Sequence, residues 1–338
     1  MRKTAALLLC LLFCLSFSLS AGETVTYGSA SFDSEAEYID LGDQKVTNLT
    51  KFITFLKSFP NLTAVDMFAT PVTAADVQKL EKAFPGVRFG WYLKMMRYHF
   101  VRTDADAYSA LDGTHPRHSE AEFSLLKYCP DLLALDLGHN DIRQGAFLEN
   151  MPNLRVLILG DNPKLNCLDL ISTLQNLEYL ELFSCGITDI SPLTKLTNLM
   201  DLNLSNNSVE DWRPLKEMKW LKRLWISGMC TGKRKKAELT AAEQQELEEA
   251  LPDTEIVYVG EPTQNGWRFY DDRKGDSPSN RVPHYAVIME MFHSDPQHYV
   301  PFEDSPSLSA PPADGDETGR LVVDGSDIEE EILNEDQQ

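Results

Sequence analysis

The chain has 338 residues, of which 43% are hydrophobic, 25% charged and 9% aromatic, as in a folded protein of one large domain or two smaller ones. This composition excludes a collagen-like chain, a disulfide-stabilised miniprotein and global disorder. The 31 Lys and Arg against 52 Asp and Glu give a net charge of −21, which disfavours nucleic acid and anionic lipid as partners.

Residues 1–21 are typical of a secretory signal peptide. Arg2 and Lys3 precede an apolar stretch over 5–17, and small residues follow at 18–21. The apolar stretch is short for a membrane span, so an uncleaved anchor is the weaker alternative. We therefore expect an exported protein that is secreted or held at the cell surface.

Residues 36–46 and 62–72 share an apolar spacing that recurs more clearly further along the chain. In the second segment Leu62, Val65 and Met67 precede Thr70, and the first segment fits more loosely. Apolar residues at helical spacing follow each of them. The second helix begins with a capping-box sequence at Thr73, and the same device recurs at Ser119 and Thr240. These segments predict a strand followed by a helix.

Residues 87–116 interrupt this spacing and form a predicted insertion. Phe89, Trp91 and Leu93 alternate along the chain, and Tyr98 and Phe100 do so after them. This alternation predicts a pair of strands. The insertion either covers an edge of the sheet or contributes to function.

The central part of the chain repeats with a period of 22 or 23 residues. Each unit has apolar residues at its first, fourth and sixth positions, which is typical of a short strand with one buried face. Because one unit cannot bury its own leucines, we expect the units to stack into a parallel sheet. The units begin at Leu132, Leu154, Leu177, Leu199 and Leu221.

The ninth position of these units is polar in most cases. Asn140, Asn162 and Asn207 are expected to turn inward and satisfy backbone groups where each strand ends. Cys185 takes this position in one unit, where we expect a buried thiol. The four cysteines beyond the signal peptide contain no CxxC pair, so neither a zinc knuckle nor a redox motif is predicted.

This pattern resembles the short, 22-residue class of leucine-rich repeats found in internalins and related bacterial surface proteins. The resemblance is carried by ITDISPLTKL at 187–196 and, more loosely, by VEDWRPL at 209–215. It implies an α/β solenoid with a parallel concave sheet and a convex side of helices and tight turns. It also implies that the concave face binds a host or cell-surface protein. The whole layout is similar to secreted leucine-rich repeat proteins of Gram-positive bacteria.

The domain organisation follows from these segments. The repeat domain is predicted to span 22–260, with its insertion at about 87–116. Residues 261–302 are rich in aromatics, and Tyr285, Ile288, Met289 and Phe292 share one helical face; we expect a cap over the last repeat, with a ligand site as the alternative. Residues 303–338 hold twelve acidic residues and one basic residue, which predicts a disordered tail.

The predicted partner-binding surface follows from stacking the strands in register. Residues between the leucines then project onto one concave sheet, where aromatic side chains lie near charged ones, as in protein interfaces. In the alternative arrangement, the insertion or the C-terminal tail folds over this face and buries the aromatics. The predicted binding residues are Ile158, Tyr179, Glu181, Phe183, Asp201, Asn203, Arg223 and Trp225.

We therefore predict a protein-binding module that is not an enzyme and that uses no cofactor or metal. The sequence contains none of the catalytic motifs GxSxG, HExxH and GxxxxGK[ST]. The histidines at 115 and 118, and those at 293 and 298, are interpreted as ordinary loop residues. Two alternatives stay open. One is an enzyme or carbohydrate-binding protein with its site in the insertion or the C-terminal region, and the other is a purely structural surface component.

Overall fold

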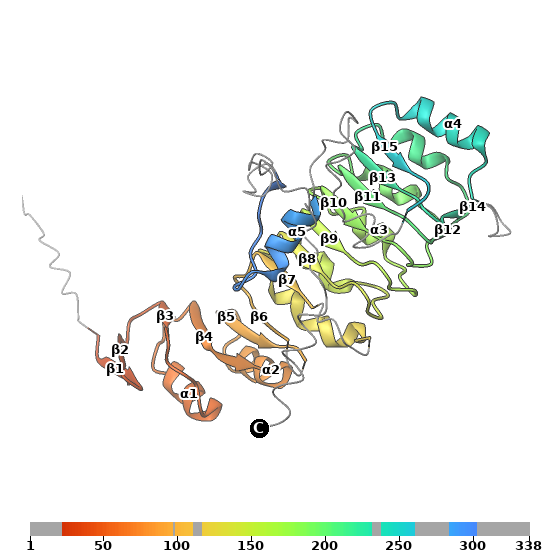
Figure 1. The fold of residues 1–338 in the computed structure, drawn as a ribbon. Helices are drawn as coiled ribbons and strands as arrows, with labels where there is room; N and C mark the ends of the chain where they lie inside the picture. The colour runs from red at the N-terminus through yellow and green to blue at the C-terminus, as the bar shows by residue number, and fades with distance from the viewer. Residues whose placement is uncertain (1–21, 97–98, 111–116, 232–237, 261–283, 303–338) are drawn as a thin grey trace, which may run out of the picture.

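The computed structural model describes residues 22–96, 99–110, 117–231, 238–260 and 284–302. Helices and strands follow one another in chain order along an elongated molecule, and only the last helix turns back onto earlier elements (Figure 1). The predicted signal peptide and the predicted acidic tail lie outside the described residues. Within the described part, no helix is long and apolar enough to cross a membrane.

The N-terminal part is a four-stranded sheet with two helices on one side (Figure 1). A short hairpin precedes it and closes the end of its core, because Tyr27 and Phe32 pack against Phe52, Phe55 and Phe59. The hairpin consists of β1 (Thr24–Tyr27) and β2 (Ala30–Asp33). The sheet and helices are β3 (Tyr38–Asp40), α1 (Leu49–Leu56), β4 (Ala64–Val72), α2 (Ala74–Ala83), β5 (Arg88–Lys94) and β6 (Phe100–Arg102).

The predicted strand pair of the insertion corresponds to β5 and β6. These strands run antiparallel, with Tyr92 opposite Arg102 and Lys94 opposite Phe100. β5 also pairs in parallel with β4, so it extends the N-terminal sheet instead of forming a separate cover. Tyr98, which was assigned to the second strand, lies outside the described residues.

The central part is a seven-stranded sheet in which every described pairing is parallel. Its strands arise where the leucines at the fourth position of each unit turn into the core, as Leu180, Leu202 and Leu224 do. The first strand, β7, lies within the predicted insertion and was not expected. The strands are β7 (Ala107–Ser109), β8 (Ala134–Asp136), β9 (Val156–Ile158), β10 (Tyr179–Glu181), β11 (Asp201–Asn203), β13 (Arg223–Trp225) and β15 (Glu255–Val257).

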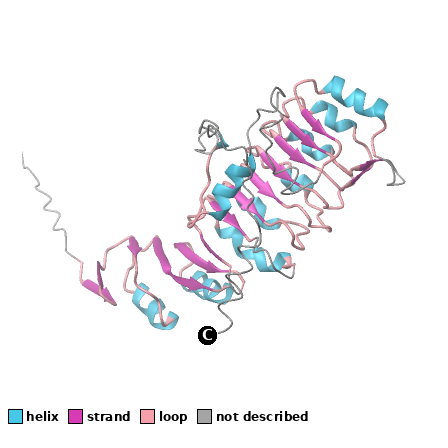
Figure 2. Cartoon of the chain, viewed as in Figure 1, coloured by secondary structure: helices cyan, strands magenta, loops and turns pink. Residues whose placement is uncertain are grey.

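The convex side of the repeats mixes helices with tight 3₁₀ turns (Figure 2). Pro192 and Pro214 occupy the first turn of two of these segments, where a missing backbone N–H costs nothing. The 3₁₀ segments are Glu120–Tyr128, Ala146–Asn150, Ser191–Lys195 and Arg213–Glu217. The other convex elements are α3 (Leu168–Ile171), α4 (Ala241–Ala250) and a small parallel sheet of β12 (Ser208–Val209) and β14 (Cys230–Thr231).

The predicted polar ladder is present at the ends of the strands. Asn162 accepts a hydrogen bond from the Ile142 backbone N–H at 2.8 Å and donates to the carbonyls of Leu137 and Leu159. Cys185 is 1% exposed, and its Sγ lies 3.1 Å from the Leu159 carbonyl oxygen. Burial raises the pKa of this thiol to about 12, so it is a neutral core group at physiological pH.

The C-terminal helix α5 (His284–His293) lies on the concave side of the seven-stranded sheet, together with the chain up to Phe302 (Figure 1). This position differs from the predicted cap over the last repeat. The end of the core is instead closed by α4, whose Leu247 is fully buried, and by β15. Residues 261–283 lie outside the described part of the chain.

Candidate partner-binding surface

The strand register brings the predicted binding residues together on one face. Tyr179 pairs with Val156 and Asp201, and Glu181 pairs with Ile158 and Asn203. Arg223 and Trp225 continue the two columns on β13. The spacing of the leucines therefore predicted which side chains are neighbours across the concave sheet.

These side chains are not open to solvent, contrary to the expectation from the sequence. Seven of the eight are buried, and Arg223 is partly buried. The face is covered by segment 284–302, which was predicted as a cap over the last repeat, whereas the alternative had assigned this role to the insertion or the tail. The physical reason is the apolar first column, Ala134, Val156 and Tyr179, whose exposure to water would cost roughly 25 cal/mol per Å².

The C-terminal segment 284–302 supplies a matching apolar surface. Its buried side chains form a hydrophobic cluster with the sheet, separate from the leucine core. The ring of Phe302 lies 6.0 Å from the ring of Tyr179. The segment contributes Val287, Ile288, Met291, Phe292, Val300 and Phe302, and the sheet contributes Ala107, Ala134, Val156, Ile158, Tyr179 and Trp225.

Polar contacts fix the position of this segment on the first strands. The Ser109 backbone N–H donates to Gln297 Oε1 at 2.9 Å, and the Tyr299 backbone N–H donates to Asp106 Oδ1 at 3.0 Å. The Arg155 guanidinium lies 5.4 Å from the centre of the Tyr299 ring. A short helix followed by an extended stretch is thus held by apolar burial and by specific hydrogen bonds.

The charged residues of the covered face are paired within the sheet. The Tyr179 hydroxyl donates to Glu181, and Arg223 Nη2 lies 3.2 Å from Asp201 Oδ2. Both carboxylates are almost fully buried. Buried carboxylates require such partners, because an unpaired buried charge is costly.

Phe183 lies at the end of β10, beside the apolar cluster. Its ring packs over Gly160, where an added Cβ would lie 2.1 Å from Phe183 Cε1. His139 meets the same ring edge-on, with centroids 5.8 Å apart. Gly160 thus provides the space for Phe183, which is 4% exposed.

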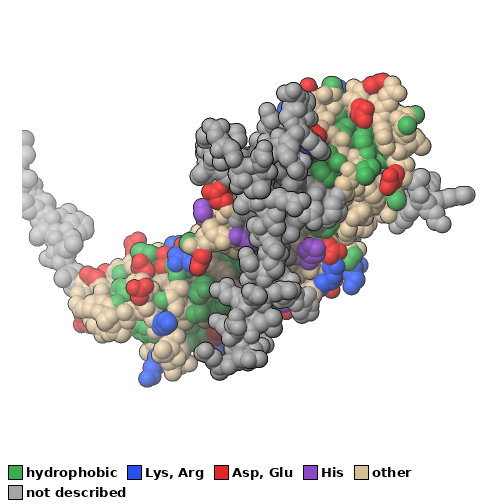
Figure 3. Space-filling model, viewed as in Figure 1, with side chains coloured by type: hydrophobic (Ala, Val, Ile, Leu, Met, Phe, Trp, Pro, Cys, Tyr) green, Lys and Arg blue, Asp and Glu red, His purple; other side chains and the backbone are tan. Residues whose placement is uncertain are grey.

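The four-stranded N-terminal sheet presents a second face, which the sequence analysis did not identify. On the side away from α1 and α2, its residues are exposed or partly exposed, except for Gly90. Hydrophobic, basic and acidic side chains lie close together over this part of the molecule (Figure 3). We call this surface the open face and define it by Phe68, Arg88, Tyr92, Lys94, Phe100 and Arg102.

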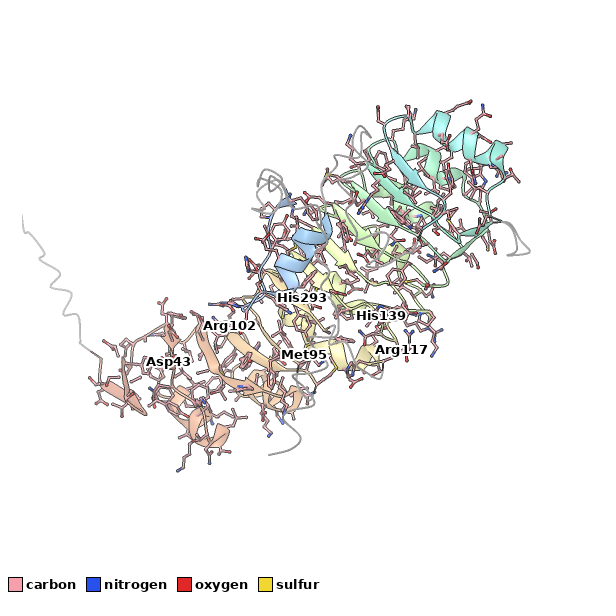
Figure 4. All side chains as sticks on the ribbon, viewed as in Figure 1. Asp43, Met95, Arg102, Arg117, His139 and His293 are labelled. Atoms are coloured by element: carbon pink, nitrogen blue, oxygen red, sulfur yellow. The ribbon has the colours of Figure 1, made fainter. Side chains whose placement is uncertain are left out.

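The alternation of β5 was the signal that could have revealed this face. Its odd-numbered residues are Phe89, Trp91 and Leu93, which enter the core, so its even-numbered residues must point to the opposite side. Arg102 of β6 lies opposite Tyr92 of β5 and is labelled in Figure 4. Its guanidinium stacks 3.9 Å from the centre of the Phe68 ring.

The histidines singled out in the sequence have ordinary structural contacts where they are described. His118 Nδ1 lies 3.3 Å from Glu122 Oε1, and its ring meets that of His99 edge-on. His298 Nδ1 lies 3.1 Å from the Ser294 hydroxyl. In the described ranges, no three His, Cys, Asp or Glu side chains are placed to hold a metal ion.

Comparison with known proteins identifies the repeats. Residues 175–217 match a family model described as leucine-rich repeats in two copies. No curated protein matches the chain. Similar solved structures include internalin C2 of Listeria monocytogenes, with 26% identity over 46% of this chain and 71% of that chain and a TM-score of 0.36.

Two further structures have lower identity. A second Listeria monocytogenes internalin is 17% identical over 69% of this chain and 70% of that chain, with a TM-score of 0.35. A leucine-rich repeat protein of Leptospira interrogans is 16% identical over 61% and 57% of the two chains, with a TM-score of 0.35. The family match at 175–217 and the large parallel sheet fit an α/β protein built on leucine-rich repeats.

Proposed function

We propose that this chain is an exported protein-binding module whose concave repeat face binds a protein partner. Leucine-rich repeats generally mediate binding between proteins, through the extended concave surface that stacking creates. The observation that supports the proposal is the docking of segment 284–302, in which this face contacts a polypeptide segment of the chain itself.

Access to this face requires the C-terminal segment to leave. The predicted binding residues Ile158, Tyr179 and Trp225 share a hydrophobic cluster with Met291 and Phe292. A partner that binds them therefore competes with the segment of the chain itself. The binding-competent population sets the apparent affinity, so any change that releases the segment should strengthen binding.

A capture experiment tests this proposal. The purified chain is immobilised and exposed to extracts of the cell surface, and the bound proteins are identified by mass spectrometry. Met291→Asp places a charge in the cluster and should release the segment, so a specific partner should be captured several-fold more than by the wild type. His293→Asp, an exposed change on the same helix, is the matched control and should behave as the wild type.

A second variant locates the binding. The double variant Ile158→Asp, Met291→Asp should lose the increased capture of the partner, because Ile158→Asp places a charge on β9 in the concave face itself. Circular dichroism and thermal unfolding verify that each variant retains the repeats. Equal capture by all folded variants, or no specific capture by any of them, would contradict the proposal.

A further inference from the structure

We propose that the open face is a second binding surface, which recognises an extended acidic peptide segment of a partner protein. The peptide would carry carboxylates on both sides of an apolar side chain. This inference uses only residues of the N-terminal sheet. It does not depend on release of the C-terminal segment or on binding at the seven-stranded sheet.

The two cations at the ends of β5 are exposed, and only Arg88 has an acidic partner among the described residues. Arg88 has a 68% exposed side chain, and its Nη1 is 3.8 Å from Asp66 Oδ1, beyond hydrogen-bond distance. Among the described residues, no carboxylate forms an ion pair with exposed Lys94, whose Nζ lies 5.9 Å from the centre of the Phe100 ring. A partner's carboxylates would supply a counter-charge to Lys94 and a closer one to Arg88.

Two carboxylates of this region have hydrogen-bond partners, although Asp66 Oδ1 accepts no hydrogen bond from the described residues. Asp104 accepts two hydrogen bonds from Arg102, at 2.7 and 2.8 Å. Asp66 accepts from the Tyr38 hydroxyl at 2.8 Å. At the two ends of β5, the exposed side chains Arg88 and Lys94 are positive.

Aromatic rings share this face with the cations. The rings of Tyr92 and Phe100 stack with centroids 5.4 Å apart and are partly exposed. Phe68 is held beneath Arg102, which the Asp104 pair fixes in turn. Such preformed aromatic and arginine surfaces are typical of interfaces that bind peptides and proteins.

The spacing of the cations sets the length of the ligand. Arg88 and Lys94 lie at opposite ends of β5 on the same face, about 20 Å apart at the rise of a strand. An extended peptide that spans them would pass over the ring of Phe68, which packs against Gly90, and over Tyr92. A single small anion would not reach both cations.

The charge of this part of the chain permits an acidic ligand. Residues 22–105 contain ten acidic and nine basic residues, although the whole chain carries −21. The negative charge is therefore concentrated elsewhere. At physiological ionic strength, electrostatic interactions are screened over about 8 Å. Acidic residues in other parts of the chain therefore act weakly on the open face.

Peptide binding to the full chain provides the test. The probe is a short fluorescent peptide with glutamates at both ends and a phenylalanine at its centre, and binding is measured by fluorescence anisotropy. We expect saturable binding that weakens as salt is raised. A peptide with glutamine in place of every glutamate should bind at least about tenfold more weakly.

Three variants of the chain decide where the peptide binds. Lys94→Glu should weaken peptide binding at least about tenfold. Lys94→Arg keeps the positive charge and should bind the peptide like the wild type. Lys82→Glu makes the same charge change on α2, on the other side of the sheet, and should have little effect. Thermal unfolding verifies that the variants fold. Equal binding of the two peptides, or equal effects of Lys82→Glu and Lys94→Glu, would overturn the proposal.

Discussion

Asn207 is a single buried side chain that joins two consecutive repeats. Its Oδ1 accepts from the backbone N–H groups of Cys185 and Ile187, and its Nδ2 donates to the carbonyls of Leu182 and Leu204. Backbone groups at the end of a short strand have few other partners. The Asn207 side chain therefore makes the hydrogen bonds that water would make to these backbone groups if they were exposed.

Replacement of Asn207 should destabilise the repeats strongly. Asn207→Ala leaves buried donors and acceptors without partners, and we expect the free energy of unfolding in urea to fall by about 2 to 4 kcal/mol. Asn206 is exposed, with a φ of 56°, a conformation that glycine adopts easily. Asn206→Gly is therefore the control and should change stability by less than about 0.5 kcal/mol. Similar losses for both variants would contradict the assigned role.

Single residues also show what the sequence could predict. The asparagine ladder and Cys185 follow a local pattern, so their positions could be read from spacing alone. The neighbours of Tyr179 and Trp225 across the sheet followed from the same register. Their burial did not, because it depends on docking of a distant segment, as in the hydrogen bond from Ser109 to Gln297, 188 residues away.

At the level of elements, the three capping boxes predicted from the sequence are all present, at α2, at Glu120–Tyr128 and at α4. At α4, Glu243 accepts from the Thr240 backbone N–H at 2.8 Å and from Trp212 Nε1 at 3.2 Å. It thus ties the helix to the preceding 3₁₀ segment. The hydrogen bond from the Thr240 backbone is the largest of the effects that lower the pKa of Glu243.

This capping contact should make stability depend on pH. Because the pKa of Glu243 is lower in the folded state, its contribution is complete above the unfolded-state pKa and is lost as pH falls through the folded-state value. We expect Glu243→Gln to flatten the decline of the melting temperature between roughly pH 5 and pH 3. Glu249→Gln, on the exposed side of the same helix, should retain the wild-type slope. Identical slopes for the two variants would exclude the capping role.

Some elements could not be predicted because they have little local signal. β7 has three residues, and it forms because its Tyr108 aligns with Leu135 of β8 and enters the core. The hairpin β1–β2 depends on aromatic contacts with α1, such as Tyr27 with Phe52. In both cases a neighbouring element supplies the stability that the segment itself lacks.

At the scale of the whole molecule, the two sheets differ in whether the face away from the helices is covered. The seven-stranded sheet is covered by residues 284–302, whereas the four-stranded sheet keeps Arg88, Tyr92 and Lys94 accessible. Composition and net charge do not distinguish the two faces. The difference is that an apolar column binds one segment of the chain, whereas a mixed aromatic and charged surface stays accessible among the described residues.

Hydrogen–deuterium exchange of the full chain tests the account most directly, because it measures whether segment 284–302 is docked on the concave face. In the wild type, the backbone amides of α5 should be protected well above the level of an isolated helix, and Met291→Asp should abolish this protection while β8–β11 remain protected. Exchange of α5 at unfolded-chain rates in the wild type would contradict the account, as would loss of protection throughout the repeats on Met291→Asp.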